Sequence, residues 1–402
     1  MPLSYSDVLR ARRAIADATV TTPTVHATRL SMQLGLDLHL KLENLQHTNA
    51  FKARGALAKL LSLSPEEQAR GVIACSAGNH AQGVAYHAAR LGMRSVIVMP
   101  HGTPFNKIKR TQDFGGQVEL HGQTFEEAMA VTRQMVEREG LVLIHPFDDP
   151  IVAAGQGTVA CEMLEQVPDL DVIVVPIGGG GLIAGMAVAA KAINPEIEVI
   201  GAQALLFDAV KAELEGFEPH FDTASLAEGI AVKTPGEANL ALIRAHVDRV
   251  ESVTEEEIET AVFDLLSNEK LVAEGAAGAG MAVVTKLRET LRGRKVGLVI
   301  CGGNIDSRIL SSLILRGLVR DGRIARLTFE IDDRPGQLAE ISRVIGDAGA
   351  NVIEVIHQRM FQAVALKQAE LDVVIEARDR FHVREIVEDL RGRGFKLRAQ
   401  GD

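Results

Sequence analysis

A single lysine near the N-terminus stands between an apolar stretch and a run of good helix formers. Residues 38–42 alternate apolar and polar side chains, which predicts a strand, and residues 53–63 place apolar side chains at helical spacing. Lys52 therefore lies on the connection, next to Phe51. A lysine partly removed from water has a lowered pKa, and its free amine can form a Schiff base. The alternative is an ordinary solvated lysine.

Four consecutive glycines lie between a predicted strand over residues 172–175 and a predicted helix over residues 181–193. Free N–H groups at a helix start, with no side chains in the way, can bind a phosphate. One alternative is a tight turn made for close packing. Another is dinucleotide binding, although Gln203 stands where an NAD site would place an acidic residue. The candidate phosphate ligands are the backbone amides of Gly178, Gly179, Gly180, Gly181 and Leu182.

Two further short motifs follow predicted strands. The run Ser76-Ala77-Gly78-Asn79-His80 follows a strand over residues 72–74 and on its own reads as a helix N-cap. The run Cys301-Gly302-Gly303-Asn304 follows a strand over residues 296–300, and a lone buried cysteine is usually an apolar filler.

Together these motifs resemble one known family. Lys41-Leu42-Glu43-Asn44, followed by Thr48 to Ala56, is similar to the lysine motif of the threonine/serine dehydratases, which are fold-type-II pyridoxal-phosphate (PLP) enzymes, and the other motifs follow in the family's order. The resemblance implies a PLP cofactor on Lys52 and two open parallel α/β sheets, as in tryptophan synthase β. It places a small lobe at roughly residues 50–150, inserted in a large lobe.

The resemblance also implies roles for individual residues. Lys52 is the catalytic residue, and Cys301 faces the pyridine nitrogen, where a thiol favours β-elimination over transamination because it cannot hold the ring protonated. The substrate carboxylate is received by Ser76, Gly78, Asn79 and His80. The cofactor-binding set is Phe51, Lys52, Asn79, Gly178, Gly179, Gly180, Gly181, Leu182 and Cys301.

Three further positions bear on the predicted site. Some relatives carry a divalent cation held by carboxylates where this chain has Gln203 and Ala209, so we expect no metal there. Asn49 stands where relatives often have a small residue, and it contacts either the substrate side chain or only its own loop. Glu274 either faces the active site, as in relatives, or caps a helix.

The remaining pattern predicts an α/β architecture. Short β-rich runs alternate with helical stretches, which implies mostly parallel open sheets covered on both faces. Further strands are predicted at residues 95–99, 117–120 and 198–202. Further helices are predicted at residues 82–91, 124–137, 255–266 and 276–287.

The composition shifts near residue 318, where a second domain is expected. We predict a catalytic part over residues 1–318, a polar linker over 319–326 and a βαββαβ domain over 327–402. The last part resembles an ACT domain, which implies binding of an amino-acid effector such as isoleucine or valine. The candidate effector residues are Asp333, Arg334, Pro335, Gly336, Leu338 and Asn351.

Composition restricts the partners. The net charge is −10, and no long Lys/Arg run is present, which argues against a nucleic-acid or anionic membrane partner. Three widely spaced cysteines and an N-terminus without an apolar signal segment favour a cytoplasmic protein with reduced thiols. The expected partner is a small amino-acid substrate, and the expected assembly is a homodimer or homotetramer.

The sequence thus predicts PLP-dependent deamination of L-threonine to 2-oxobutyrate and ammonia, with L-serine as a further substrate. Serine racemase and hydroxyaspartate dehydratase remain alternatives within the family. Outside it, the alternatives are an NAD-binding Rossmann dehydrogenase, against which Gln203 argues, and a non-catalytic amino-acid sensor, against which the intact Lys52 argues.

Overall fold

The computed structural model describes residues 3–222, 224–332, 334–358 and 368–400. Its contacts divide the chain into two units, Met1–Ile305 and Asp306–Asp402. The division lies before helix α14 (Ser307–Arg320), whereas the sequence predicted a catalytic part that continues to residue 318. The expected linker over 319–326 includes the last two residues of α14 and the start of strand β11 (Ile324–Asp332), so it forms a short helix-to-strand turn.

The first unit contains a small lobe built on a four-stranded parallel sheet. Its elements are α3 (Lys52–Leu61), α4 (Pro65–Arg70), β3 (Val72–Cys75), α5 (Asn79–Arg90), β4 (Ser95–Met99), α6 (Phe105–Asp113), β5 (Gln117–Leu120), α7 (Phe125–Glu139) and β6 (Val142–Leu143). The strand order is β5-β4-β3-β6. Successive residues of β3 point to opposite faces, so Val72 and Ala74 pack with α5 while Ile73 and Cys75 pack with α7.

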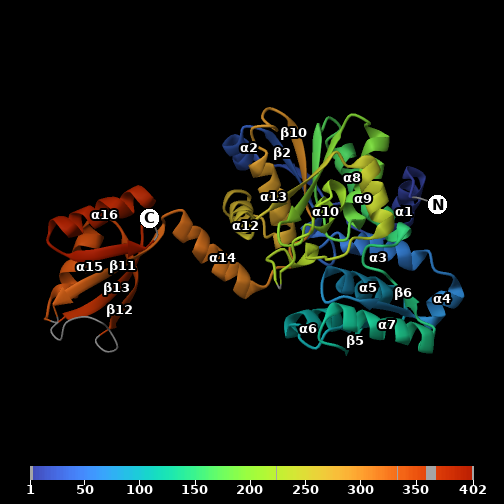
Figure 1. Ribbon diagram of the computed structural model, residues 1–402, viewed down its shortest axis with the longest axis horizontal. Helices are drawn as coiled ribbons and strands as arrows, with labels where there is room; N and C mark the ends of the chain where they lie inside the picture. Colours follow the sequence, from blue (N-terminus) through green and yellow to red (C-terminus); the bar gives the residue numbers. More distant parts are fainter. Residues whose placement is uncertain (1–2, 223, 333, 359–367, 401–402) are drawn as a thin grey trace. The chain divides into compact units, whose positions relative to one another are not determined.

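The large lobe is built on a six-stranded sheet in the order β1-β2-β10-β7-β8-β9, parallel except for β1 with β2. Its elements are α1 (Tyr5–Ile15), η1 (Ala16–Ala18), β1 (Thr24–His26), α2 (Thr28–Leu34), β2 (Asp37–Leu42), η2 (Glu43–Leu45), α8 (Pro150–Gln166), β7 (Val172–Pro176), α9 (Gly181–Ile193), β8 (Glu198–Ala204), α10 (Ala209–Glu215), η3 (Glu228–Ile230), α11 (Glu237–His246), β9 (Arg249–Val253), α12 (Glu255–Glu269), α13 (Gly275–Lys286) and β10 (Lys295–Ile300). Figure 1 shows α13 on one side of this sheet and α8 and α9 on the other. The predicted α/β class with two mostly parallel sheets is confirmed.

Three helices of this unit touch through their backbones. A Cβ atom added at Gly155 of α8 would lie 2.7 Å from the Cα atom of Gly55 in α3. One added at Gly157, on the same helix, would lie 2.6 Å from the carbonyl oxygen of Gly185 in α9. The glycines therefore let α3, α8 and α9 pack more closely than any side chain would allow.

The second unit has the predicted βαββαβ order. Its elements after α14 are β11 (Ile324–Asp332), α15 (Gln337–Asp347), β12 (Asn351–Gln358), β13 (Gln368–Glu376), α16 (Arg380–Gly392) and β14 (Lys396–Gln400). The antiparallel sheet has the order β12-β13-β11-β14. The alternating Leu327, Phe329 and Ile331 of β11 are buried against the apolar faces of α15 and α16, which confirms the predicted half-buried strand.

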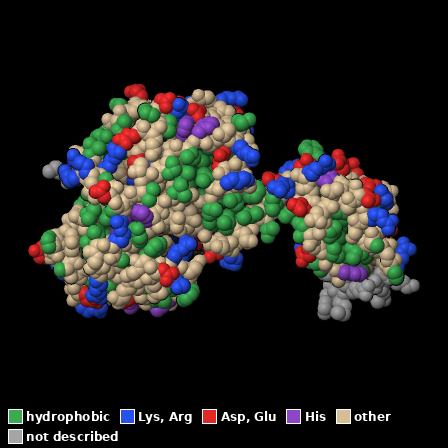
Figure 2. Space-filling model, turned by 180° about the vertical axis from the view of Figure 1, so that it is seen from behind, with side chains coloured by type: hydrophobic (Ala, Val, Ile, Leu, Met, Phe, Trp, Pro, Cys, Tyr) green, Lys and Arg blue, Asp and Glu red, His purple; other side chains and the backbone are tan. Residues whose placement is uncertain are grey.

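On the face shown in Figure 2, acidic and basic side chains are interspersed, and this face presents no extended cationic surface. Among the described residues, no helix is both long and apolar enough to cross a membrane.

Candidate active site

Lys52 is the first residue of α3, directly after its N-cap Phe51, so it lies inside the helix rather than on the predicted connection. Its Nζ donates a hydrogen bond to the carbonyl oxygen of Pro146 at 2.7 Å. Burial lowers the pKa of the Lys52 amine to about 8, while Cys301 and Glu274 raise it by less. The residue is half-buried, and its amine is deprotonated more easily than that of a surface lysine.

This lowered pKa predicts a distinctive labelling profile. In cofactor-free protein, the rate at which a small amine-specific reagent modifies Lys52 should rise with a midpoint near pH 8, because only the free amine reacts. Exposed lysines should follow their ordinary pKa of about 10.4. Peptide mass spectrometry across a pH series measures the labelling of Lys52 and of the exposed lysines in the same samples. A Lys52 midpoint above about pH 10 would contradict the lowered pKa.

Four buried charged side chains hold the start of α3 in place. Arg54 donates to Glu43 at 2.8 Å from both Nε and Nη2, and its Nη1 donates to Glu162 at 2.6 Å. Lys41 donates to the other oxygen of Glu162 at 2.8 Å. Desolvation alone would raise the pKa of Glu162, but the hydrogen bonds and charges of Arg54 and Lys41 outweigh it and lower that pKa. Two cations and two carboxylates therefore balance beneath the helix that carries Lys52.

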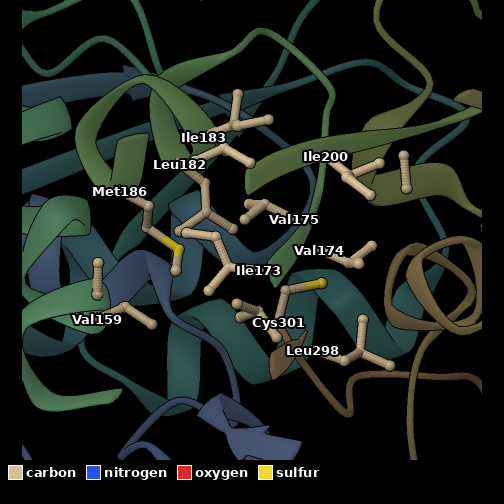
Figure 3. Close-up of a cluster of buried hydrophobic side chains, with 14 of the residues drawn as sticks. Val159, Ile173, Val174, Val175, Leu182, Ile183, Met186, Ile200, Leu298 and Cys301 are labelled. Carbon is tan, nitrogen blue, oxygen red and sulfur yellow. The ribbon is translucent and has the colours of Figure 1, made fainter. Parts of the chain in front are cut away.

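Asn79 is held in one orientation by its neighbours. Asn304 Nδ2 donates to Asn79 Oδ1 at 2.8 Å, and Asn79 Nδ2 donates to the two carboxyl oxygens of Glu274 at 3.0 and 2.9 Å. Cys301 Sγ lies 3.8 Å from Glu274 Oε1. Burial raises the pKa of Glu274, and burial together with Glu274 raises the pKa of Cys301 well above its usual value. Cys301 is therefore a neutral thiol, and Figure 3 shows it among buried apolar side chains.

The hydrogen bonds of His80 limit how this residue could take part in the expected carboxylate loop at Ser76 to His80. His80 Nε2 bonds to the carbonyl oxygen of Ile144 at 2.9 Å, so this nitrogen carries the proton. Burial first, and Lys52 second, lower the pKa of His80 to about 3, so the ring is neutral. The buried Nδ1 then has only a lone pair and cannot donate to a carboxylate. Only the backbone amide of His80, in the first turn of α5, remains available for that role.

Gly178, Gly179 and Gly180 lie directly before α9, Gly181 is its first residue, and Gly180 has a positive φ of 90°. Within the described residues, none of the amides of Gly178 to Gly181 donates a hydrogen bond to a backbone carbonyl. A Cβ at Gly179, however, would lie 2.2 Å from the ring of Phe147. The glycine loop therefore combines close packing against Phe147 with amides that have no backbone acceptor. Enlarging Gly179 would disturb this packing and could not by itself test phosphate binding.

The structure also places residues that the local patterns only partly indicated. Leu182 packs its side chain in the core, so only its backbone faces the loop. Asn49, with a positive φ of 56°, donates from Nδ2 to the carbonyl oxygen of Asn44 at 3.2 Å, which is a contact within its own loop. Pro146, Phe147 and Asn239 were not predicted, because they act through backbone carbonyls and contacts distant in sequence. No local motif marks them.

In the C-terminal unit, a pocket of about 360 Å³ lies at the expected effector position. Arg334, Pro335, Gly336 and Leu338 line it, whereas Asn351 is not among its described lining residues, and Asp333 lies outside the described residues. Gln337, inside the expected segment, also lines the pocket, whereas the sequence did not indicate the remaining lining residues, which are Ile331, Asp332, His357 and Leu371.

Two parts of the chain match known protein families. Residues 15–302 match the family described as pyridoxal-phosphate dependent enzyme, and residues 325–393 match the ACT domain. The chain therefore belongs to the PLP-dependent enzymes and carries a C-terminal ACT domain. This membership answers the question left open by the glycine motif in favour of PLP rather than NAD.

More specific similarity is found along the whole chain. The L-threonine ammonia-lyase of Thermotoga maritima is 42% identical over 401 residues, which cover 99% of this chain and 100% of that protein. The solved T.th. threonine deaminase is 37% identical, with a TM-score of 0.71, and the match covers 75% of this chain and 99% of that one. The solved serine racemase of Dictyostelium discoideum is 33% identical, with a TM-score of 0.71, and the match covers 76% of this chain and 99% of that one.

The residues present suit PLP. Lys52 offers an amine of lowered pKa, and the glycine loop offers amides without backbone acceptors in the described chain. Cys301 offers a neutral thiol. PLP has one matching group for each of them. Its aldehyde suits the Lys52 amine, its phosphate suits the amides of the glycine loop, and its pyridine nitrogen suits the Cys301 thiol.

Proposed function

We propose that this protein deaminates L-threonine to 2-oxobutyrate and ammonia, and L-serine to pyruvate more slowly. The observation that carries the proposal is the similarity to L-threonine ammonia-lyase over the whole chain, ACT domain included. Intact Lys52, with its lowered pKa, supports a catalytic role rather than that of a sensor.

The proposed chemistry assigns a task to each part of the site. Bound PLP supplies an electron-accepting ring that stabilises the carbanion left when the substrate loses its Cα proton. Lys52 takes that proton as general base. The Ser76 hydroxyl and the backbone amides at the start of α5, including that of Asn79, hold the substrate carboxylate, since a helix N-terminus attracts anions. The amides of Gly178 to Leu182 hold the cofactor phosphate, and Cys301 faces the ring nitrogen as a neutral thiol.

A product assay tests this proposal. Purified protein is offered L-threonine, L-serine, D-serine and 3-hydroxyaspartate, and each 2-oxo acid and each enantiomer is measured by chromatography. We expect 2-oxobutyrate from threonine to form at the highest kcat/KM. Racemised serine as the main product, or no oxo acid from any substrate, would refute the proposal.

We further propose that catalysis needs no divalent cation at the end of β8. Gln203 Nε2 donates to the carbonyl of Phe207 at 3.2 Å, and its Oε1 accepts from the amide of Lys211 at 2.9 Å. The Gln203 side chain therefore already forms hydrogen bonds through both its amide nitrogen and its oxygen at the end of this strand. The same assay in excess EDTA should give an unchanged rate.

We also propose that the ACT domain binds a branched-chain amino acid and regulates the enzyme. The pocket carries Arg334 and Asp332, which suit a carboxylate and an ammonium group, beside the apolar Leu338 and Leu371. Coupling of typical strength, about 1 to 3 kcal/mol, would change the apparent affinity for threonine about 5- to 150-fold. The three cysteines are free and buried, which suits the reducing cytoplasm, and a homodimer or homotetramer is the proposed assembly.

Removal of the second unit tests this regulation. The cut belongs after Ile305, because α14 groups with the C-terminal unit. The truncated enzyme should stay active without responding to isoleucine or valine, while the full-length enzyme responds at millimolar concentration. The solved T.th. threonine deaminase, which has no counterpart to a quarter of this chain, supports independent folding of the catalytic part. A full-length enzyme that neither binds nor responds to any amino acid other than its substrates would exclude the regulatory role.

A further inference from the structure

A buried asparagine links two loops of the active site. Asn239 lies in α11 and is only 2% exposed. Its Nδ2 donates to the carbonyl oxygen of Phe147 at 2.9 Å and to that of Gly179 at 3.1 Å. Both protons of the side-chain amide are thus used, one for each loop.

The first of these loops also holds the catalytic lysine. Pro146, the neighbour of Phe147, accepts the hydrogen bond of Lys52 Nζ at 2.7 Å. The Phe147 ring packs on Gly179, where an added Cβ would lie 2.2 Å from the ring. The segment Pro146-Phe147 therefore contacts Lys52 on one side and the glycine loop on the other.

The hydrogen bond from Asn239 to the carbonyl oxygen of Gly179 sets the direction of the Gly180 backbone amide. Gly179 O and Gly180 N–H belong to one peptide group, and in a planar trans peptide they point in opposite directions. Asn239 and the amide of Gly236, at 3.1 Å, both donate to Gly179 O. The N–H of Gly180 is therefore turned away from α11, and it has no backbone acceptor in the described chain.

We propose that Asn239 is a positioning residue that fixes the phosphate-binding amides relative to the segment holding Lys52. The inference rests on the proposed phosphate role of the glycine loop. Asn239 is assigned no contact with the reacting atoms or the cofactor. It acts by holding two carbonyl groups, and its loss should weaken recognition of the phosphate specifically.

The test compares two aldehydes that differ only in the phosphate. Full-length protein freed of cofactor is titrated with PLP and with pyridoxal, and each Kd is read from absorbance. Asn239→Leu, of similar size but without donors, should raise the Kd for PLP about 10- to 100-fold, the loss expected from two buried hydrogen bonds. The Kd for pyridoxal should stay within about 2-fold, because pyridoxal does not use the loop.

Two further variants separate positioning from general destabilisation. Leu242→Ala removes buried apolar contact from the same helix and should lower the melting temperature without changing the ratio of the two Kd values. Asn239→Thr keeps one donor and should give an intermediate ratio; it decides the question if Asn239→Leu does not fold. An unchanged ratio in Asn239→Thr or Asn239→Leu, or equal weakening of both aldehydes, overturns the inference. Equal wild-type affinity for both aldehydes would instead refute the phosphate site itself, and the inference with it.

Discussion

Replacement of Lys52 by alanine is expected to lower kcat for threonine about 10³-fold or more, because one change removes both the anchor of the cofactor and the general base. The wild-type protein should be yellow, and borohydride should abolish its visible absorbance. Peptide mapping after reduction should find the pyridoxyl group on Lys52. Steady-state kinetics and the absorbance spectrum of one preparation measure both effects.

Lys59 provides the matched control. It lies on the same helix, and its amine forms an ion pair with Asp149 at 2.7 Å. Lys59→Ala should therefore keep the colour and most of the activity. A colourless but active wild-type enzyme, or a label on another lysine, would show that Lys52 has been assigned the wrong role.

Replacement of Arg54 by methionine is expected to lower the free energy of unfolding of the catalytic unit by about 3–5 kcal/mol, the usual cost of breaking a buried ion pair. Methionine fills much of the volume but leaves Glu43 and Glu162 buried without their main partner. Urea unfolding followed by circular dichroism measures the loss. Arg10→Met, which breaks an exposed pair with Asp7, should cost no more than about 1 kcal/mol.

The pH dependence of this loss has a defined sign. A carboxylate whose pKa is lowered in the folded state stabilises the fold above its unfolded pKa, 4.5 for Glu162, and loses that contribution as the pH falls through the folded value. The difference between wild type and Arg54→Met should therefore shrink below about pH 4.5. A constant difference from pH 7 to pH 3, or a loss no larger than that of Arg10→Met, would show that the buried charges are not the cause.

Much of the fold could be predicted because many of its strands have a recognisable local sequence pattern. The β-branched run at residues 172–175 is a buried parallel strand, and alternation at Leu327, Phe329 and Ile331 identified β11. Helix α8 was missed because it is buried on nearly all sides and rich in alanine and glycine, so it shows no amphipathic period. Strand β6 has only two residues, which is too short for any pattern.

Some residues of the candidate site could likewise be predicted from local motifs, and others could not. Lys52 and the glycine loop could be found because a short motif fixes each of them. The pairing of Asn239 with Gly179 joins residues 60 positions apart, and nothing near Asn239 marks it. The sequence also could not show that His80 donates to Ile144, since a ring's tautomer depends on its folded neighbours.

The backbone contacts among α3, α8 and α9 have a consequence for cofactor choice. Lys52 begins α3, and the glycine loop leads into α9, so these helices carry the two ends of the proposed cofactor site. Glycine-to-glycine packing through α8 leaves no side-chain rotamers that could adjust the distance between them. We therefore expect the three helices to keep the spacing between the start of α3 and the glycine loop nearly constant, so an aldehyde with a longer phosphate arm should bind more weakly than PLP.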